Sequence, residues 1–297
     1  MISVVIPVYN EAGSVARVID DLHVAMHAVS EPYEIIVVDD GSTDGSAGAL
    51  RLRSDITLLQ HSVNRGYGRA LKTAIAHAKG DWIAICDADA TYPVSALGSL
   101  LEARKDNDMV VGSRGQTRNI SLPRRVGQWI LKRLVWMLVQ VNVPDLNSGF
   151  RVFRRDLAEE FWGLLPDGFS FTTTITVSAL CAGRGVAYVP IDYHKRVGKS
   201  SINPVKDFHN FMLLIIMTAT YFRPLKFYAP MAYVLFGLAI LRAIRDIVVL
   251  DRLAGLSVVL VTLAVQVWFF GLLADIVVKR SERRHHRDDA GRPAGRG

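Results

Sequence analysis

Two aspartates separated by a single residue, Asp87 and Asp89, could together hold a divalent cation. The segment before them, Asp81 to Cys86, is short and apolar, as a buried strand is. The pair would therefore lie at the carboxyl end of a strand, where open α/β folds bind their ligands. Carboxylate oxygens suit Mg²⁺ or Mn²⁺, and such an ion neutralises a departing diphosphate. Because Asp-x-Asp also arises by chance, the rest of the chain must decide between these two interpretations.

The chain becomes much more apolar toward its C-terminus. Residues 1–204 have the composition of a soluble domain. Leu253 to Ala274 is uncharged, and its length matches the roughly 20 residues that cross the hydrocarbon layer of a bilayer. Phe227 to Leu241 is uncharged over a shorter distance and then meets Arg242, so it needs a thinned bilayer or snorkelling arginines. The sequence predicts two transmembrane helices within residues 227–278.

The segments that flank these spans indicate how the chain would sit in a membrane. Phe211 to Phe222 is too short to cross and predicts an interfacial amphipathic helix within residues 205–226, with a buried core helix as the alternative. Two crossings return the chain to its starting side. The tail 279–297 is strongly basic, so the positive-inside rule places it and the N-terminal domain in the cytoplasm. We therefore expect a multi-pass protein of the cell (inner) membrane.

Composition argues against several other classes of protein. Met1 leads directly into a strand, so no secretory signal peptide is expected. Cys86 and Cys181 lie in apolar surroundings and are predicted to be reduced core thiols. The net charge of +7 falls largely in the tail and around the spans, where anionic lipid accounts for it. Since no nucleic-acid motif is present, no nucleic-acid partner is expected.

Strand and helix signals alternate along the N-terminal domain. Short apolar or β-branched runs predict strands, and apolar residues at helical spacing predict the helices between them. The predicted strands are 2–6, 34–38, 56–59, 81–86 and 109–111, and the predicted helices are 15–29, 69–79, 94–104 and 122–140. This alternation predicts an α/β fold with a doubly wound, mostly parallel sheet.

Polar clusters follow three of the predicted strands. They are residues 7–11 (PVYNE), 39–44 (DDGSTD) and 87–89 (DAD). Each cluster alone could be turn chemistry, because Asp, Gly, Ser and Asn are the residues that turns use. Three acidic clusters at three strand ends of one sheet favour a ligand site instead.

At this point the chain resembles the inverting family 2 glycosyltransferases, and within them the dolichol-phosphate mannose synthase and bacterial polyprenyl-phosphate glycosyltransferase group. The likeness runs in family order over roughly residues 1–205. It rests on VVIPVYNE (4–11), VVDDGSTDGS (37–46), NRGYGRALKTAIAHAKGD (64–81), DADATYP (87–93), VVGSR (110–114), NSGFRVFRR (147–155) and RVGKS (196–200). The resemblance implies a GT-A-like sheet.

The resemblance also implies a nucleotide site and a metal site. The implied nucleotide-binding residues are Pro7, Tyr9, Asn10, Glu11, Asp39, Asp40 and Ala88. An ionised Asp39 or Asp40 can accept hydrogen bonds from a base imide or from ribose hydroxyls. Asp87 and Asp89 would be the catalytic residues that hold Mg²⁺ or Mn²⁺. Many relatives have a Gln two residues after the second Asp; here Thr91 stands there, which puts that third metal contact in question.

A lipid phosphate acceptor needs fixed cations near the membrane. Arg114, Arg124, Arg196 and Lys199 are the candidates, because arginine in particular matches phosphate with two parallel hydrogen bonds. Arg196 is also predicted as catalytic. For Arg124, simple contact with lipid headgroups is an equal alternative. Some relatives carry an acid where Gly149 stands in NSGFR, so no general base is expected there.

These features together predict inverting transfer of a sugar from a nucleoside diphosphate sugar, UDP- or GDP-linked, to polyprenyl phosphate at the cytoplasmic membrane face. The acceptor phosphate, with a second pKa near ~6, is already nucleophilic at neutral pH. The sugar, the base and the polyprenol length are not specified by the sequence.

Three rival functions remain. A processive polysaccharide synthase shares the fold but carries Gln-x-x-Arg-Trp and more crossings, and a nucleotidyltransferase needs a Gly-rich loop where residues 7–11 stand. A non-catalytic nucleotide-binding membrane scaffold is the third.

The predicted spans contain glycines that would permit close helix approach and a homo-oligomer: Gly237, Gly255 and Gly271. A lipid-embedded monomer is the alternative.

Overall fold

The computed structural model describes residues 1–115, 133, 135–136, 139–193, 216–218 and 220–290, with 280–290 as backbone only. The chain divides into two compact units, residues 1–214 and 215–297. Each unit is described by itself.

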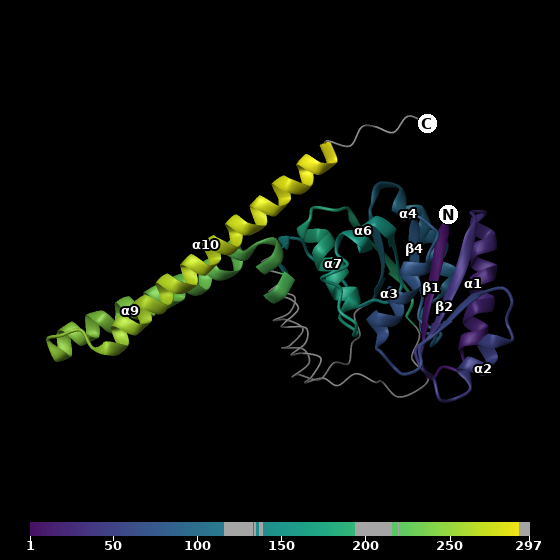
Figure 1. Cartoon of the computed structure of the whole chain (residues 1–297), viewed down its shortest axis with the longest axis horizontal. Coiled ribbons are helices and arrows are strands. Elements are labelled where there is room, and N and C mark those ends of the chain that lie inside the picture. Colours follow the sequence, from purple (N-terminus) through teal and green to yellow (C-terminus); the bar gives the residue numbers. More distant parts are fainter. Residues whose placement is uncertain (116–132, 134, 137–138, 194–215, 219, 291–297) are drawn as a thin grey trace. The chain divides into compact units, whose positions relative to one another are not determined.

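A seven-stranded sheet forms the centre of the first unit (Figure 1), in the order β3-β2-β1-β4-β6-β5-β7. The strands are β1 Ile2–Val8, β2 Tyr33–Asp39, β3 Thr57–Gln60, β4 Trp82–Ile85, β5 Met109–Arg114, β6 Arg151–Arg154 and β7 Val186–Ile191. β6 runs antiparallel to both of its neighbours, β4 and β5, and the other paired strands are parallel. The predicted α/β fold with a mostly parallel sheet is confirmed.

Helices pack on both faces of this sheet. They are α1 Val15–Val29, α2 Ser46–Arg51, α3 Tyr67–His77, α4 Leu97–Ala103, α6 Arg155–Glu160 and α7 Phe171–Cys181, with short 3₁₀ turns η1 Val94–Ala96 and η2 Arg104–Asp106. Figure 1 shows α1 on one side of β1 and β2 and α3 on the other.

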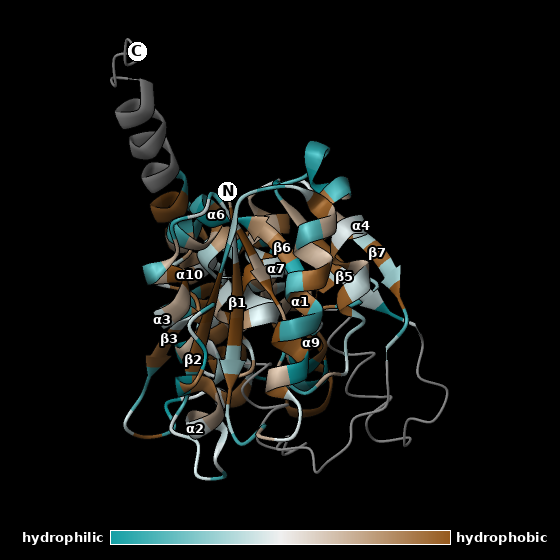
Figure 2. Cartoon of the chain, turned by 90° about the vertical axis from the view of Figure 1, so that its right-hand side faces the viewer, coloured by the Kyte–Doolittle hydropathy of each residue, from teal (hydrophilic) through white to brown (hydrophobic). Residues whose placement is uncertain are grey.

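Hydrophobic periodicity explains these packing contacts. The buried residues of α1 recur every three or four positions: Val15, Val18, Ile19, Leu22 and Met26. They join the alternate residues of β1 that point to the same face of the sheet, and Leu100 of α4 completes this layer. In Figure 2, most of β1 is apolar, whereas α1 alternates between polar and apolar surfaces. The carboxyl ends of β1, β2 and β4 are thereby fixed side by side.

The second unit contains two long helices, α9 Pro224–Leu250 and α10 Gly255–Ala290. Four residues connect the two helices, and they pack against each other as a hairpin. Of the residues that the structure describes, only the helical stretch Gly255–Lys279 is both long and apolar enough to be a candidate membrane span. The first predicted span, Phe227 to Leu241, lies within α9, and most of the predicted interfacial helix falls outside the described residues.

A buried aspartate ties the two helices together near their connection. Asp246 of α9 is 1% exposed and accepts hydrogen bonds from the hydroxyl of Ser257 (2.5 Å) and the backbone N–H of Ala254 (3.2 Å). Its other oxygen lies 3.3 Å from the Nε of Arg242. Arg242 and Asp246, which interrupt the first apolar stretch, therefore form an ion pair, and Asp246 also caps the start of α10.

The three glycines of the hairpin differ in their surroundings. A Cβ added at Gly271 would come within 2.8 Å of the Cβ of Tyr228, so this glycine permits close approach of α10 to α9. At Gly237 and Gly255, an added Cβ would meet nothing within 4 Å among the described residues. Only these two remain available for the predicted contact between copies of the chain.

Candidate active site

The loops that follow β1 and β2 are locked together at the carboxyl edge of the sheet. The backbone N–H of Asn10 donates to the hydroxyl of Ser42 (3.0 Å), and the Asn10 amide oxygen accepts from the N–H of Thr43 (2.8 Å). One residue on, the N–H of Glu11 donates to the hydroxyl of Ser46 (2.9 Å). Asn10 adopts a left-handed conformation with φ of 57°, which asparagine tolerates better than most residues. Two of the three predicted clusters thus form one polar surface.

Asp39 and Asp40, both 3% exposed, are bonded mainly to neighbouring loops. Asp39 accepts from the N–H of Ser42 (3.1 Å) and from the side-chain amide of Gln60 (3.2 Å). Asp40 accepts from two backbone N–H groups of the loop before α3 and lies 2.6 Å from the Nδ1 of His61. Tyr9, by contrast, is 44% exposed. Of these three side chains, only that of Tyr9 is open to stack on a base.

Asp87 and Asp89 follow β4, and both are half-buried. Asp89 is oriented locally, because its Oδ1 accepts from the backbone N–H (3.1 Å) and the hydroxyl (2.6 Å) of Thr91. Ala90, which lies between Asp89 and Thr91, has φ of 55°, and this turn brings Thr91 back onto the Asp89 carboxylate. Asp87 is oriented by a residue far away in the sequence, since its Oδ1 accepts the phenol hydrogen of Tyr67 at 2.8 Å.

The donor set of these residues fits a hard divalent cation that shares its ligands with a substrate. Two carboxylates supply the oxygens that Mg²⁺ and Mn²⁺ prefer. No group of three or more His, Cys, Asp or Glu side chains that could hold a metal occurs among the residues described. An ion held here would therefore take its remaining ligands from phosphate oxygens and water, as Mg²⁺ sites commonly do. Thr91, which stands where relatives have a ligating Gln, is 1% exposed and uses its hydroxyl to orient Asp89.

Two tyrosines, the half-buried Tyr67 and the buried Tyr92, lie beside Asp87. Burial, followed by the charge of Asp87, raises the pKa of Tyr67 well above its ordinary value of 10.0. Burial also raises the pKa of Tyr92, again with Asp87 as the next contribution. Both phenols therefore keep their protons at any physiological pH and can act as hydrogen-bond donors. Both tyrosines lie in motifs of the family 2 resemblance, but no role for them was predicted from the sequence.

Arg114 is the one predicted lipid-phosphate ligand that lies within the described residues. Its guanidinium makes two hydrogen bonds to Asp145, Nε to Oδ2 at 2.7 Å and Nη2 to Oδ1 at 2.9 Å, and lies over the ring of Tyr193. Burial raises the pKa of Asp145, but hydrogen bonding and the charge of Arg114 outweigh it and lower the pKa below 3.8. The cation is thus already paired. Arg124, Arg196 and Lys199 lie outside the described residues.

A further arginine of the same region, Arg151, was not singled out from the sequence. It is fully buried on β6 and donates to the carbonyl oxygens of Ser148 and Thr172 and to the hydroxyl of Thr176 (2.8 Å). These contacts attach the segment before β6 to α7, so Arg151 supports the backbone around Gly149.

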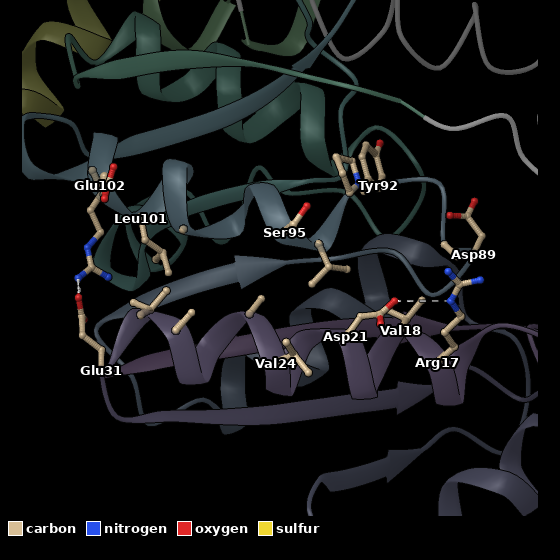
Figure 3. A pocket seen from close by; sticks show the side chains of 18 of the residues that line it. Arg17, Val18, Asp21, Val24, Glu31, Asp89, Tyr92, Ser95, Leu101 and Glu102 are labelled. Carbon is tan, nitrogen blue, oxygen red and sulfur yellow. Dashed lines mark hydrogen bonds and ion pairs between the residues drawn. The ribbon is translucent and has the colours of Figure 1, made fainter.

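A groove of about 1020 Å³ runs from Asp89 between α1 and the η1–α4 segment (Figure 3). Arg17, Asp89 and Tyr92 lie at one end. At the other end Arg104 forms an ion pair with Glu31, 2.5 Å apart. The side chains between these ends are mainly small or apolar.

Comparison with known proteins agrees with this arrangement. Residues 3–162 match the domain described as glycosyl transferase family 2. The chain belongs to this family. Residues 223–279 of this family 2 chain match the GtrB C-terminal hairpin, which corresponds to α9 and the apolar part of α10. The structural division into a catalytic-type α/β unit and a helical hairpin therefore coincides with two recognised domains.

Similar proteins include sugar transferases of bacteria and archaea. The low-salt glycan biosynthesis hexosyltransferase Agl6 of Haloferax volcanii is 32% identical over 69% of this family 2 chain and 51% of its own length. The undecaprenyl-phosphate 4-deoxy-4-formamido-L-arabinose transferase of Aeromonas hydrophila is 32% identical over 54% of the chain and 50% of its own length. The chain thus spans about half the length of these two relatives. Glycosyltransferase AglJ of Haloferax volcanii is 27% identical over 93% of each protein.

Solved structures of similar fold include glucosyl-3-phosphoglycerate synthase from Mycobacterium tuberculosis in complex with Mn²⁺ and UDP-glucose. It matches 73% of this chain and 78% of its own with a TM-score of 0.58 and 19% identity. This likeness establishes the GT-A-type fold alone.

Proposed function

We propose that this chain transfers a single sugar from a nucleoside diphosphate sugar, UDP- or GDP-linked, to polyprenyl phosphate at the cytoplasmic face of a membrane. The observation that carries the proposal is the pair Asp87 and Asp89, oriented by separate partners at the carboxyl end of β4, in a chain that also has an apolar helical hairpin. The relatives named for undecaprenyl phosphate support the acceptor class. A multi-pass anchor, with both α9 and α10 crossing, completes the proposal.

The proposed reaction is a direct displacement. A dianionic phosphate oxygen of the lipid attacks the anomeric carbon of the sugar, the bond from that carbon to the nucleoside diphosphate breaks, and the configuration inverts. The attacking phosphate, with a second pKa near ~6, needs no enzyme base. Asp87 and Asp89 would hold Mg²⁺ or Mn²⁺, which when bound supplies charge neutralisation for the leaving diphosphate. Tyr9, at the edge of β1, would stack on the base.

The acceptor side of the proposal rests on arginine and lysine residues. Arg196 and Lys199, with Arg124, are proposed to bind the lipid phosphate, because two parallel hydrogen bonds from arginine match its oxygens. Arg114 is proposed to bind the phosphate with both Nε and Nη2 only if the phosphate displaces Asp145, since the carboxylate accepts from these two nitrogens now.

The test of the reaction is transfer of radiolabelled sugar to organic-extractable lipid, in membranes containing the full chain and added polyprenyl phosphate. Replacing Asp89 with Ala should reduce transfer by about 100-fold or more, because a metal-site electrostatic contribution is worth several kcal/mol. Asp106→Ala, an exposed acid on η2 at the opposite edge of the sheet, should leave transfer unchanged. Undiminished transfer by Asp89→Ala would contradict the proposed role of Asp89 in metal binding.

The form of the labelled product decides between this function and its rivals. One sugar on the lipid agrees with the proposal. A growing polymer would point to a processive synthase, and nucleotide binding without transfer to any prenyl phosphate would point to a scaffold. Thermal stabilisation by UDP and by GDP, each with Mn²⁺, identifies the donor base, because a ligand that binds only the folded chain raises its Tm.

A further inference from the structure

Tyr67 contacts one of the two proposed metal-binding carboxylates from a separate element. Tyr67 is the first residue of α3, whereas Asp87 follows β4. The phenol hydroxyl of Tyr67 donates to the Oδ1 of Asp87 at 2.8 Å. Its ring stacks on Phe169, with ring centres 5.6 Å apart and planes 20° from parallel. The phenol is therefore held in position independently of the hydrogen bond.

Glycines on both sides of Tyr67 make this placement sterically feasible. A Cβ added at Gly66 would lie 2.6 Å from the carbonyl oxygen of Asp167, and one added at Gly68 would overlap the carbonyl oxygen of Pro166. Gly66 also has φ of 102°, a conformation that side chains rarely adopt. The start of α3 thus lies directly against the loop that leads to Phe169.

Asp40 fixes the same turn from the other side. Its Oδ2 accepts from the backbone N–H of Gly66 at 2.8 Å, and its Oδ1 accepts from the N–H of Arg65 at 2.9 Å. The side chain of His61, 6% exposed, bridges Asp40 to the hydroxyl of Thr73 farther along α3. The carboxylate that the sequence placed at the nucleoside therefore anchors the residues immediately before Tyr67.

The second oxygen of Asp87 is confined by backbone. A Cβ added at Gly149 would lie 2.5 Å from the Oδ2 of Asp87, so any side chain at this position would collide with the carboxylate. The N–H of Gly149 is held in turn by the hydroxyl of Tyr92 at 2.9 Å. Between Tyr67 and Gly149, the Asp87 carboxylate has little freedom to rotate.

We propose that Tyr67 is a positioning residue for the metal-binding carboxylate Asp87, and that Asp40 acts through the α3 turn to hold Tyr67 in place. This inference rests on the proposed function of Asp87 and Asp89. Hydrogen bonds from outside the ligand set fix the orientation of ligating carboxylates, and their loss commonly lowers metal affinity by about 10- to 100-fold. Tyr67 itself need not touch the ion.

The decisive variant is Tyr67→Phe, which removes one hydroxyl and keeps the ring that stacks on Phe169. The full chain is purified in detergent, and Mn²⁺ is titrated with UDP and, in parallel, with GDP at fixed concentration. The readout is the Mn²⁺ concentration that gives half of the maximal thermal stabilisation. We expect it to rise by about 10- to 100-fold in Tyr67→Phe. Tyr188→Phe is the matched control, because the described residues offer its buried hydroxyl no hydrogen-bond partner.

A second variant, Gly149→Ala, crowds Asp87 from the opposite side while leaving Tyr67 intact, and should raise the same Mn²⁺ midpoint. A purely structural role would lower the metal-free Tm of Tyr67→Phe and leave the Mn²⁺ midpoint at the wild-type value, which overturns the inference. If the wild type responds to Mn²⁺ no better than Asp89→Ala, the proposed metal site itself fails. These two failures are distinguishable. Failure of the metal site shows in the comparison of the wild type with Asp89→Ala, whereas failure of the positioning role shows only in Tyr67→Phe.

Discussion

Single side chains of the site owe their orientation to partners at very different sequence distances. Asp89 is fixed by Thr91, two residues away, whereas Asp87 is fixed by Tyr67, twenty residues earlier. The pattern Asp-x-Asp after an apolar run was enough to predict both carboxylates as a pair. It could not reveal the partner of Asp87, because that contact depends on where α3 begins relative to β4. It could not reveal the role of Thr91 either, since that depends on the left-handed turn at Ala90.

The pairing of Arg114 with Asp145 has a testable pH dependence. The pKa of Asp145 is lower in the folded chain than its ordinary 3.8, so the pair stabilises the fold above pH 3.8 and this contribution disappears as the pH falls through the folded-state pKa. Asp145→Asn should therefore cost about 1–3 kcal/mol near neutral pH. Thermal melts in detergent from pH 7 to below 3.8 should show the gap between wild type and variant closing. A gap independent of pH would contradict this.

At the scale of elements, the sequence predicted the first half of the sheet better than the second. The runs at 2–6 and 34–38 appear as β1 and β2, and the weak run at 56–59 appears as β3, one residue later. These strands are β-branched or apolar and flanked by turn residues. β6 was not predicted, because Arg151–Arg154 has an arginine at each end, and Arg151 is buried although its residue type is usually exposed. Its antiparallel insertion between β4 and β5 depends on tertiary pairing that no local pattern expresses.

The start of α3 should be sensitive to side-chain size. Gly68→Ala places a methyl group against the carbonyl oxygen of Pro166, and overpacking of this kind costs about 1–3 kcal/mol. Gly48→Ala is the matched control within α2, where an added Cβ meets nothing within 4 Å. It should be neutral or raise the stability by up to about 1 kcal/mol, because alanine favours helix. Denaturant unfolding measures both, and equal effects of the two substitutions would contradict the packing argument.

For the molecule as a whole, the proposed anchor predicts which segments face each side of the membrane. If α9 and α10 both cross, the connection between them lies outside the cell and the tail lies inside. Arg252→Cys, at an exposed position of the connection, should react with a membrane-impermeant maleimide in intact spheroplasts. Ser281→Cys should react only after lysis. The two native cysteines are buried thiols and set the background. Labelling of both positions before lysis would rule out this topology.

The length of α10 changes what its charged end can reach. The helix continues without interruption from the candidate span to Ala290, eleven residues beyond Lys279. At ~1.5 Å per residue this extension is a rod of roughly 17 Å, which exceeds the Debye length of about 8 Å at physiological ionic strength. If the rod stands upright, its last turns feel little of the headgroup field. The end of the helix would then face the surrounding water and not the headgroups.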